Sequence, residues 1–419
     1  MLTTAATARD RMVLAKHASR TISLLTDQQK SDALMAVAAE IVTATDDIVT
    51  ANAEDLARGR SNGLSEALQD RLRLDADRIA ALASAVRDVA QLPDPVGRVL
   101  DERVLPNGVA LTKVSVPFGV VGSIYEARPN VTVDIAALAL RSGNAVVLRG
   151  GSAAEQTNAA LITAMRHALT RVHVDPDGIQ TVDDFGRAGA REMMQARGLI
   201  DVLIPRGSAS LIETVVTESL VPVIETGAGV VHIVLDANAP LEWARDIVVN
   251  AKVQRPSVCN SVETVLVLRD AAARLVAPVT EALQARGVTV HGDETVGTLA
   301  DHIVPATESD WSTEYLSLDV SMKVVADLDE ALSHIRQYST GHTESIITAS
   351  ESNADRFLAE VDSAVVMVNA STRFTDGGEF GFGTEVGIST QKLHARGPMG
   401  LPELTSTKWL ARGTGQVRA

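Results

Sequence analysis

Apolar residues recur at helical spacing through the first 96 residues of the chain. Thr26 and Gln29 form a capping box immediately before the first clear run, and Pro93 and Pro95 stop the second one. The apolar positions are Leu34, Val37, Ala38 and Ile41 in the first run and Ile79, Leu82, Val86 and Val89 in the second. We therefore predict that the chain begins with amphipathic helices.

The pattern changes at about residue 98, where two runs rich in strand-forming residues flank Asn107 and Gly108. An Asn-Gly pair between such runs predicts a β-hairpin. The hairpin has no obvious sheet of its own, and a two-stranded ribbon is only marginally stable in water. We expect it to pack on another part of the fold or on another subunit.

From Phe118 onward, short apolar runs alternate with helical stretches, which is βαβ periodicity. The runs are GVVGSIY, AVVLR, DVLIP, VVHIVL, ETVLVL, ESIITAS and AVVMVN. The pattern predicts an α/β protein, and its length indicates two doubly wound parallel sheets with helices on both faces.

Composition narrows the functional classes. Hydrophobic residues make up 46% of the 419 residues and charged residues 22%, which is typical of a globular enzyme. The formal charge of -15 argues against nucleic acid as the main partner. We see no secretory signal and no apolar run that would span a membrane, and we expect a cytoplasmic protein. The nine histidines are dispersed without zinc-ligand spacing, so we expect no metal.

The single cysteine, Cys259, is the first candidate for chemistry. It lies in NAKVQRPSVCNSVETVLV, where a helical run gives way to a strand, with Arg255 and Pro256 shortly before it. A thiolate favoured by a helix N-terminus or a guanidinium would be a nucleophile. The alternative is an inert buried thiol, since free cysteine is among the most buried residue types.

Polar residues follow the first predicted parallel strand, where α/β proteins place ligand contacts. Asn130 is suited to donate to an oxyanion, and Arg128 is suited to hold a carboxylate or phosphate. The alternative is a turn asparagine beside Pro129 and a solvated arginine.

Two further turns have the features of anion sites. Arg149 ends a strand and is followed by Gly150 and Ser152, and a similar turn carries Gly207 and Ser208 at the start of a helix. Many αβ turns look the same, so these residues alone do not define a site. The GxGxxG fingerprint, the Walker motif and the GxSxG elbow are all missing, which disfavours an ordinary Rossmann dehydrogenase and a serine hydrolase.

Several longer strings together resemble the γ-glutamyl phosphate reductase family of the aldehyde dehydrogenase superfamily. They are VPFGVVGSIYEARPNVTVD, VVLRGG, IPRGSASLI, PVIETGAG, NAKVQRPSVCN, STGHTESIIT and DGGEFGFGTEVGISTQKLHARGPMG. The resemblance runs to about Trp409. It implies NADPH-dependent reduction of L-glutamyl 5-phosphate to L-glutamate 5-semialdehyde with release of phosphate, the second step of proline synthesis from glutamate.

The resemblance also implies roles for individual residues. Cys259 matches the nucleophile and Asn130 the oxyanion asparagine. The implied cofactor contacts are Arg149, Gly150, Ser152, Gly207, Ser208, Glu225 and Glu314, with Glu225 treated as a contact rather than as a deacylating base. The candidates for gripping the substrate phosphate or α-carboxylate are Arg128, Arg255 and Arg373, which the sequence cannot rank.

The implied organisation has six parts. They are the N-terminal helices of the cofactor-binding domain at 1–97, an oligomerisation hairpin at 98–117, the NADP-binding domain at 118–230, the catalytic domain at 231–364, a return to the cofactor-binding domain at 365–392 and a C-terminal oligomerisation segment at 393–419. A homo-oligomer of at least two chains is implied. Contact with glutamate 5-kinase would protect a labile substrate, but no motif proves it.

Two alternatives stay open. One is another aldehyde dehydrogenase that oxidises free aldehydes, which predicts turnover without phosphate. The other is a non-catalytic protein on this fold, with Cys259 merely buried.

Overall fold

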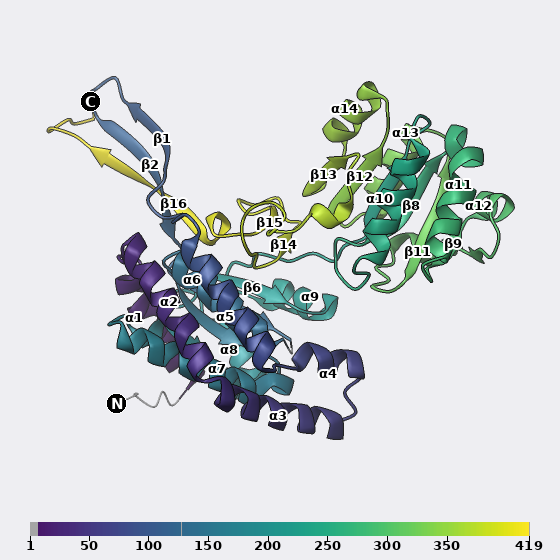
Figure 1. Ribbon diagram of the computed structural model, residues 1–419. Helices are drawn as coiled ribbons and strands as arrows, with labels where there is room; N and C mark the ends of the chain where they lie inside the picture. The colour runs from purple at the N-terminus through teal and green to yellow at the C-terminus, as the bar shows by residue number, and fades with distance from the viewer. Residues whose placement is uncertain (1–6, 127, 419) are drawn as a thin grey trace. The chain divides into compact units, whose positions relative to one another are not determined.

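A computed structural model describes residues 7–126 and 128–418. The chain divides into two compact units (Figure 1). Unit 1 comprises residues 1–225, 381–387 and 399–419, and unit 2 comprises residues 226–380 and 388–398, so the outermost residues of unit 1 lie outside the described part.

Unit 1 contains a four-stranded parallel sheet in the order β5-β4-β3-β6. Its strands are β3 (Val120–Tyr125), β4 (Ala145–Arg149), β5 (Ile179–Thr181) and β6 (Val202–Arg206). Its helices are α1 (Ala8–Ile22), α2 (Asp27–Thr43), α3 (Thr45–Ser61), α4 (Glu66–Leu72), α5 (Ala76–Gln91), α6 (Pro129–Arg141), α7 (Glu155–Arg171), α8 (Gly186–Met194) and α9 (Ala209–Glu218).

The predicted N-terminal helices are confirmed. Thr26 caps α2, since its hydroxyl accepts from the Gln29 amide at 3.2 Å while the Gln29 side chain accepts from the Thr26 amide at 2.9 Å. The apolar positions that define both predicted faces are buried. Helix α5 ends at Gln91, just before Pro93, because proline offers no amide hydrogen to continue the helix.

The predicted hairpin is also confirmed, but it does have a sheet. Strands β1 (Val99–Val104) and β2 (Ala110–Pro117) pair antiparallel around Gly108, whose φ of +86° suits glycine. Strand β16 (Thr405–Arg412) pairs with the other edge of β2 along its whole length, which gives the order β1-β2-β16. The C-terminal segment therefore supplies the third strand that a two-stranded ribbon needs.

Unit 2 contains a seven-stranded parallel sheet in the order β10-β9-β11-β8-β7-β12-β13. Its strands are β7 (Val231–Leu235), β8 (Val262–Leu268), β9 (Thr289–Gly292), β10 (Val304–Pro305), β11 (Asp319–Val325), β12 (Thr343–Ile347) and β13 (Val365–Val368). Its helices are α10 (Leu241–Val253), α11 (Arg269–Gln284), α12 (Glu294–Leu299), α13 (Leu328–Tyr338) and α14 (Glu351–Glu360). The short strands β14 (Ile388–Ser389) and β15 (Gly397–Pro398) pair with each other.

The strands of the larger sheet bury both of their faces. Ile233 and Val265 lie in the core beneath α10 and α11, whereas Val234 and Leu266 lie in the core beneath α13 and α14. Successive side chains on a strand point to opposite faces, so a strand covered on both sides reads as a continuous apolar run. Both predicted parallel sheets are confirmed.

Several of the predicted boundaries differ from the two units: unit 2 begins at Thr226 rather than at residue 231, and its last segment ends at Pro398 rather than at residue 364. The return to the first unit, expected at residue 365, comes at Gly381 instead, and residues 388–398 belong to unit 2 again. The reason is β13, which pairs with β12 and so keeps the chain in the larger sheet beyond residue 365.

Candidate active site

Cys259 lies in the loop between α10 and β8 and is partly exposed. The chain after it enters strand β8, so Cys259 does not itself begin a helix. Gly229 packs against the backbone of Cys259: a Cβ atom on Gly229 would lie 1.6 Å from the Cys259 carbonyl oxygen. Only glycine fits at this position without moving the loop.

Glu314 is brought to the same place. Its carboxylate accepts a hydrogen bond of 2.8 Å from the Gly229 amide, and Gly229 in turn touches Cys259. Burial raises the pKa of Glu314, while this hydrogen bond and the charge of Lys252 lower it. Cys259 and Glu314, which were predicted from separate motifs, therefore both contact Gly229 in unit 2.

A buried ion pair lies behind this neighbourhood. Lys252 on α10 and Glu263 on β8 are both fully buried, with 2.7 Å between Nζ and the carboxylate oxygen. Burial lowers the pKa of Lys252 and raises that of Glu263 to about 7, and each partner opposes the shift of the other. Lys252 also acts on Glu314, so this pair, which was not predicted from the sequence, borders the site.

Arg373 connects two more residues around the cysteine. Its Nε donates to the Gln254 side chain at 2.9 Å, and its Nη1 donates to the side chain of Asn260. The charges of Cys259 and Arg255 both act on its guanidinium. The structure thus brings Cys259, Arg255 and Arg373 together.

In unit 1, Arg149 and Gly150 form a compact turn at the end of β4. The Gly150 amide donates to Asp183 at 2.7 Å, and a Cβ atom on Gly150 would lie 2.1 Å from the Asn158 amide nitrogen. Burial raises the pKa of Asp183, and Arg149 opposes this shift. The Nε atom of Arg149 is buried without a hydrogen-bond partner among the described residues. Ser152 begins the turn that follows, and its carbonyl accepts from Arg58 at 3.0 Å.

The second predicted anion turn already holds a carboxylate. Glu126 accepts from the Ser208 amide at 3.1 Å and from the Ser208 hydroxyl at 2.7 Å, at the N-terminus of α9. A Cβ atom on Gly207 would lie 2.8 Å from the Glu126 carboxyl carbon. The turn therefore binds an anion, as a helix N-terminus favours.

Asn130 lies in the first turn of α6, and Arg128 is the residue that precedes the helix. The Asn130 amide donates to Asp134 at 3.1 Å. Burial raises the pKa of Asp134 to about 6, and the Asn130 hydrogen bond opposes the shift. An amide nitrogen carries two hydrogens, so this bond orients the group and leaves a second donor. Glu225 is partly buried and is the last residue of this part of unit 1.

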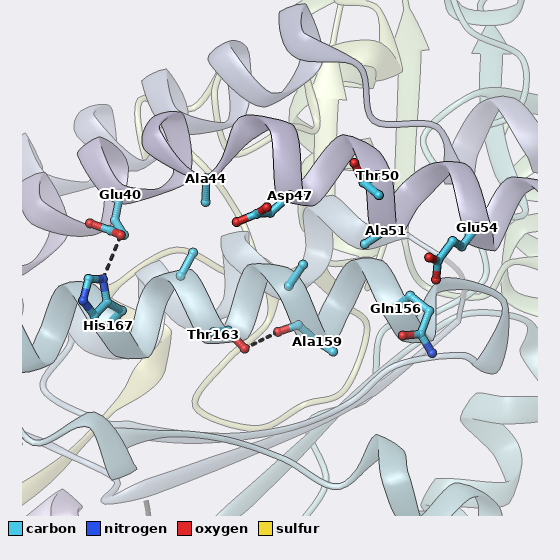
Figure 2. A pocket seen from close by; sticks show the side chains of 12 residues that line it. Glu40, Ala44, Asp47, Thr50, Ala51, Glu54, Gln156, Ala159, Thr163 and His167 are labelled. Atoms are coloured by element: carbon cyan, nitrogen blue, oxygen red, sulfur yellow. Dashed lines mark hydrogen bonds and ion pairs between the residues drawn. The ribbon is translucent and has the colours of Figure 1, made fainter. Parts of the chain in front are cut away.

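A cavity of about 610 Å³ lies elsewhere in unit 1, along α3 and α7 (Figure 2). Carboxylates of Glu40, Asp47 and Glu54 and several alanines line it, and Glu40 is hydrogen-bonded to His167 at 2.8 Å. None of the predicted catalytic or cofactor-binding residues lines this cavity.

Among the described residues, no group of three or more His, Cys, Asp or Glu side chains is arranged to hold a metal ion. The helices of the described part include none long and apolar enough to cross a membrane.

Comparison with known proteins shows the family to which this chain belongs. The family model described as "Aldehyde dehydrogenase family" matches residues 2–303, more than half of the sequence, so the chain belongs to the aldehyde dehydrogenase family.

Its relatives narrow the assignment. A gamma-glutamyl phosphate reductase from Leifsonia xyli subsp. xyli is 62% identical over 416 residues, which cover 99% of each chain. One from Clavibacter michiganensis subsp. michiganensis is 63% identical over 96% of this chain and 94% of the relative. The crystal structure of gamma-glutamyl phosphate reductase from Thermotoga maritima superposes with a TM-score of 0.97 at 43% identity, covering 98% of this chain and 100% of that one. Within the aldehyde dehydrogenases, the chain therefore belongs with the γ-glutamyl phosphate reductases.

Proposed function

We infer that this protein reduces L-glutamyl 5-phosphate to L-glutamate 5-semialdehyde and releases phosphate, the second step of proline synthesis from glutamate. Full-length relatives that carry the reductase name support this function. The observation that carries it in the structure is the partly exposed Cys259 between Gly229 and the cations of Arg255 and Arg373.

The reaction begins at the sulfur of Cys259. The thiolate attacks the acyl carbon, a carbon–sulfur bond forms, and the bond to the phosphate oxygen breaks as phosphate leaves with the electron pair. An acyl phosphate is activated, so this step needs no strong acid. The Cys259 backbone amide is assigned to donate to the oxyanion that develops on the carbonyl oxygen, and Asn130 keeps the oxyanion role that its match to the family motif implies.

The second half reduces the thioester. The fold and family carry a nicotinamide cofactor, which when bound supplies a hydride to the thioester carbon. The same donors then hold the oxyanion of the thiohemiacetal. Its collapse expels the Cys259 thiolate and releases the aldehyde, so that one acyl phosphate, one reduced cofactor and one proton yield aldehyde, oxidised cofactor and phosphate.

The residues of unit 1 fit such a cofactor, and we assign it as NADPH. The buried Arg149 Nε, which has no hydrogen-bond partner within the described part of the chain, suits a phosphate better than a bare ribose. The turn at Ser208 already holds the Glu126 carboxylate. A cofactor phosphate at Ser208 would take the place of that carboxylate. Gly150, Ser152 and Gly207 allow close approach of the backbone, and Glu225 is kept as a cofactor contact. Glu314, a residue of unit 2, keeps the nicotinamide-ribose role that the resemblance implies.

We also propose a homo-oligomer of at least two chains and keep contact with glutamate 5-kinase and a cytoplasmic location as predictions. Arg128, Arg255 and Arg373 remain the candidates for the substrate phosphate or α-carboxylate.

Replacement of the nucleophile tests the mechanism. Cys259→Ala is expected to abolish NADPH oxidation with L-glutamyl 5-phosphate supplied in situ, because the covalent step depends on sulfur. NADPH binding, measured by fluorescence titration, is expected to remain. Substantial turnover by the purified variant would overturn the thioester route.

A further inference from the structure

The Arg373 side chain bridges both ends of the loop that carries Cys259. Its Nε donates to Gln254, five residues before the cysteine, at 2.9 Å. Its Nη1 donates to Asn260, the residue directly after the cysteine. A planar guanidinium offers donors in a fixed fork, so one side chain fixes the separation of the two ends.

The segment that carries Arg373 is itself tied to the same loop. The Thr372 hydroxyl donates to the Asn260 carbonyl at 2.7 Å, and the Asn260 side chain donates to the Thr375 carbonyl at 2.9 Å. Asn260 and Thr375 are buried, so these bonds are shielded from water. The fork is therefore held in place from both sides.

The bridge also places a cation beside the sulfur. Burial lowers the pKa of Arg373, and the neighbouring Arg255 lowers it further. Asp376 opposes this shift, as do Cys259 and Glu379. A guanidinium stays protonated throughout the physiological range, so Arg373 is a fixed positive charge at the thiol.

We propose that Arg373 is a positioning residue, which orders the loop from Gln254 to Asn260 and supplies the counter-charge that favours the Cys259 thiolate. The proposal rests on the proposed function only in taking Cys259 as the nucleophile. In this proposal Arg373 contacts the enzyme's own loop and is no longer a candidate for binding the substrate. Arg255, which is exposed and lies beside it, then becomes the better candidate for the substrate phosphate.

The test is the pH dependence of Cys259 alkylation by iodoacetamide, measured on the full chain without substrate or cofactor. Cys259 is the only thiol, so the rate reports one site. We compare the wild type with Arg373→Gln, which keeps donors but loses the charge, and with Arg373→Lys, which keeps the charge but loses the fork. Arg336→Gln is the matched control, since Arg336 on α13 pairs with Glu360 at the surface.

The midpoint of the alkylation profile is expected to rise by about one pH unit in Arg373→Gln, and to rise much less in Arg373→Lys and in the control. Gln254→Leu removes one end of the fork at an exposed position, where folding is tolerant, and is expected to raise the midpoint by a smaller amount. If Arg373→Gln fails to fold, this variant decides the question.

Superimposable profiles for the wild type, Arg373→Gln and Gln254→Leu would overturn the proposal. Unchanged profiles together with a tenfold higher KM for the semialdehyde in Arg373→Gln would show that Arg373 binds the substrate instead. Because alkylation needs no turnover, failure of the proposed function would appear separately, as full activity in Cys259→Ala.

Discussion

Arg149 ends β4 with its buried Nε lacking a hydrogen-bond partner among the described residues. A charge-assisted hydrogen bond to a 2′-phosphate would satisfy that atom, whereas a ribose hydroxyl gains less from it. Arg149→Ala is therefore expected to weaken NADPH binding roughly tenfold more than NADH binding, as measured by fluorescence titration. Arg187→Ala, the same change at an exposed site on α8, is the control. Equal losses for both cofactors would show that Arg149 does not discriminate.

Single residues also show what sequence reasoning reached and what it missed. Cys259 was identifiable because its motif is specific and it is the only thiol. Gln254 and Asn260 belong to the same motif as Cys259, so the two hydrogen-bond partners of Arg373 could have been named from the sequence. Gly229 was not predicted, because its role is a backbone contact with Cys259 that no local pattern encodes.

The contact between α10 and β8 depends on the buried pair of Lys252 and Glu263. Removing one partner leaves an uncompensated buried charge, whereas removing both does not. Lys252→Met is expected to lower the free energy of unfolding by about 3–5 kcal/mol, measured by urea denaturation. The double variant Lys252→Met/Glu263→Gln is expected to recover part of that loss. Additive losses in the two single variants and the double variant would contradict coupling between the two side chains.

Strand prediction succeeded for continuous apolar runs and for the Asn-Gly hairpin, and it failed for strands that are short or interrupted by polar residues. The seven apolar runs named from the sequence became strands because continuous burial gives continuous apolar runs. Strands β5, β9 and β10 are too short to give a period. Strand β11 was not predicted from the sequence, because Ser321 and Lys323 interrupt its apolar run. Its pairing with β8 and β9 depends on residues far away in the chain.

At the scale of the whole molecule, the sheet β1-β2-β16 leaves large apolar side chains exposed, although β16 already covers one edge of the hairpin. They are Val99, Leu100, Val104, Trp409 and Leu410. Exposed apolar groups together on one sheet are typical of an interaction surface. We expect at least a dimer by light scattering at micromolar concentration.

Introducing charge tests this surface. Val99→Glu/Val104→Glu is expected to reduce the measured mass toward that of one chain, because burying two carboxylates at an interface is costly. Leu24→Glu, at an apolar residue that is 80% exposed in the turn after α1, is the control. A monomeric wild type would refute the oligomer.

The most direct test of the proposed reaction is to measure the oxidation of glutamate semialdehyde by NADP⁺ in the presence and absence of inorganic phosphate. A site that holds a leaving phosphate beside Cys259 must use phosphate as the nucleophile in reverse, because both directions share one transition state. The rate is expected to rise saturably with phosphate, to be nearly absent without it, and to be unaffected by coenzyme A. Full activity in phosphate-free buffer would mean that water resolves the thioester, which would contradict the reductase assignment and restore Glu225 as a candidate base.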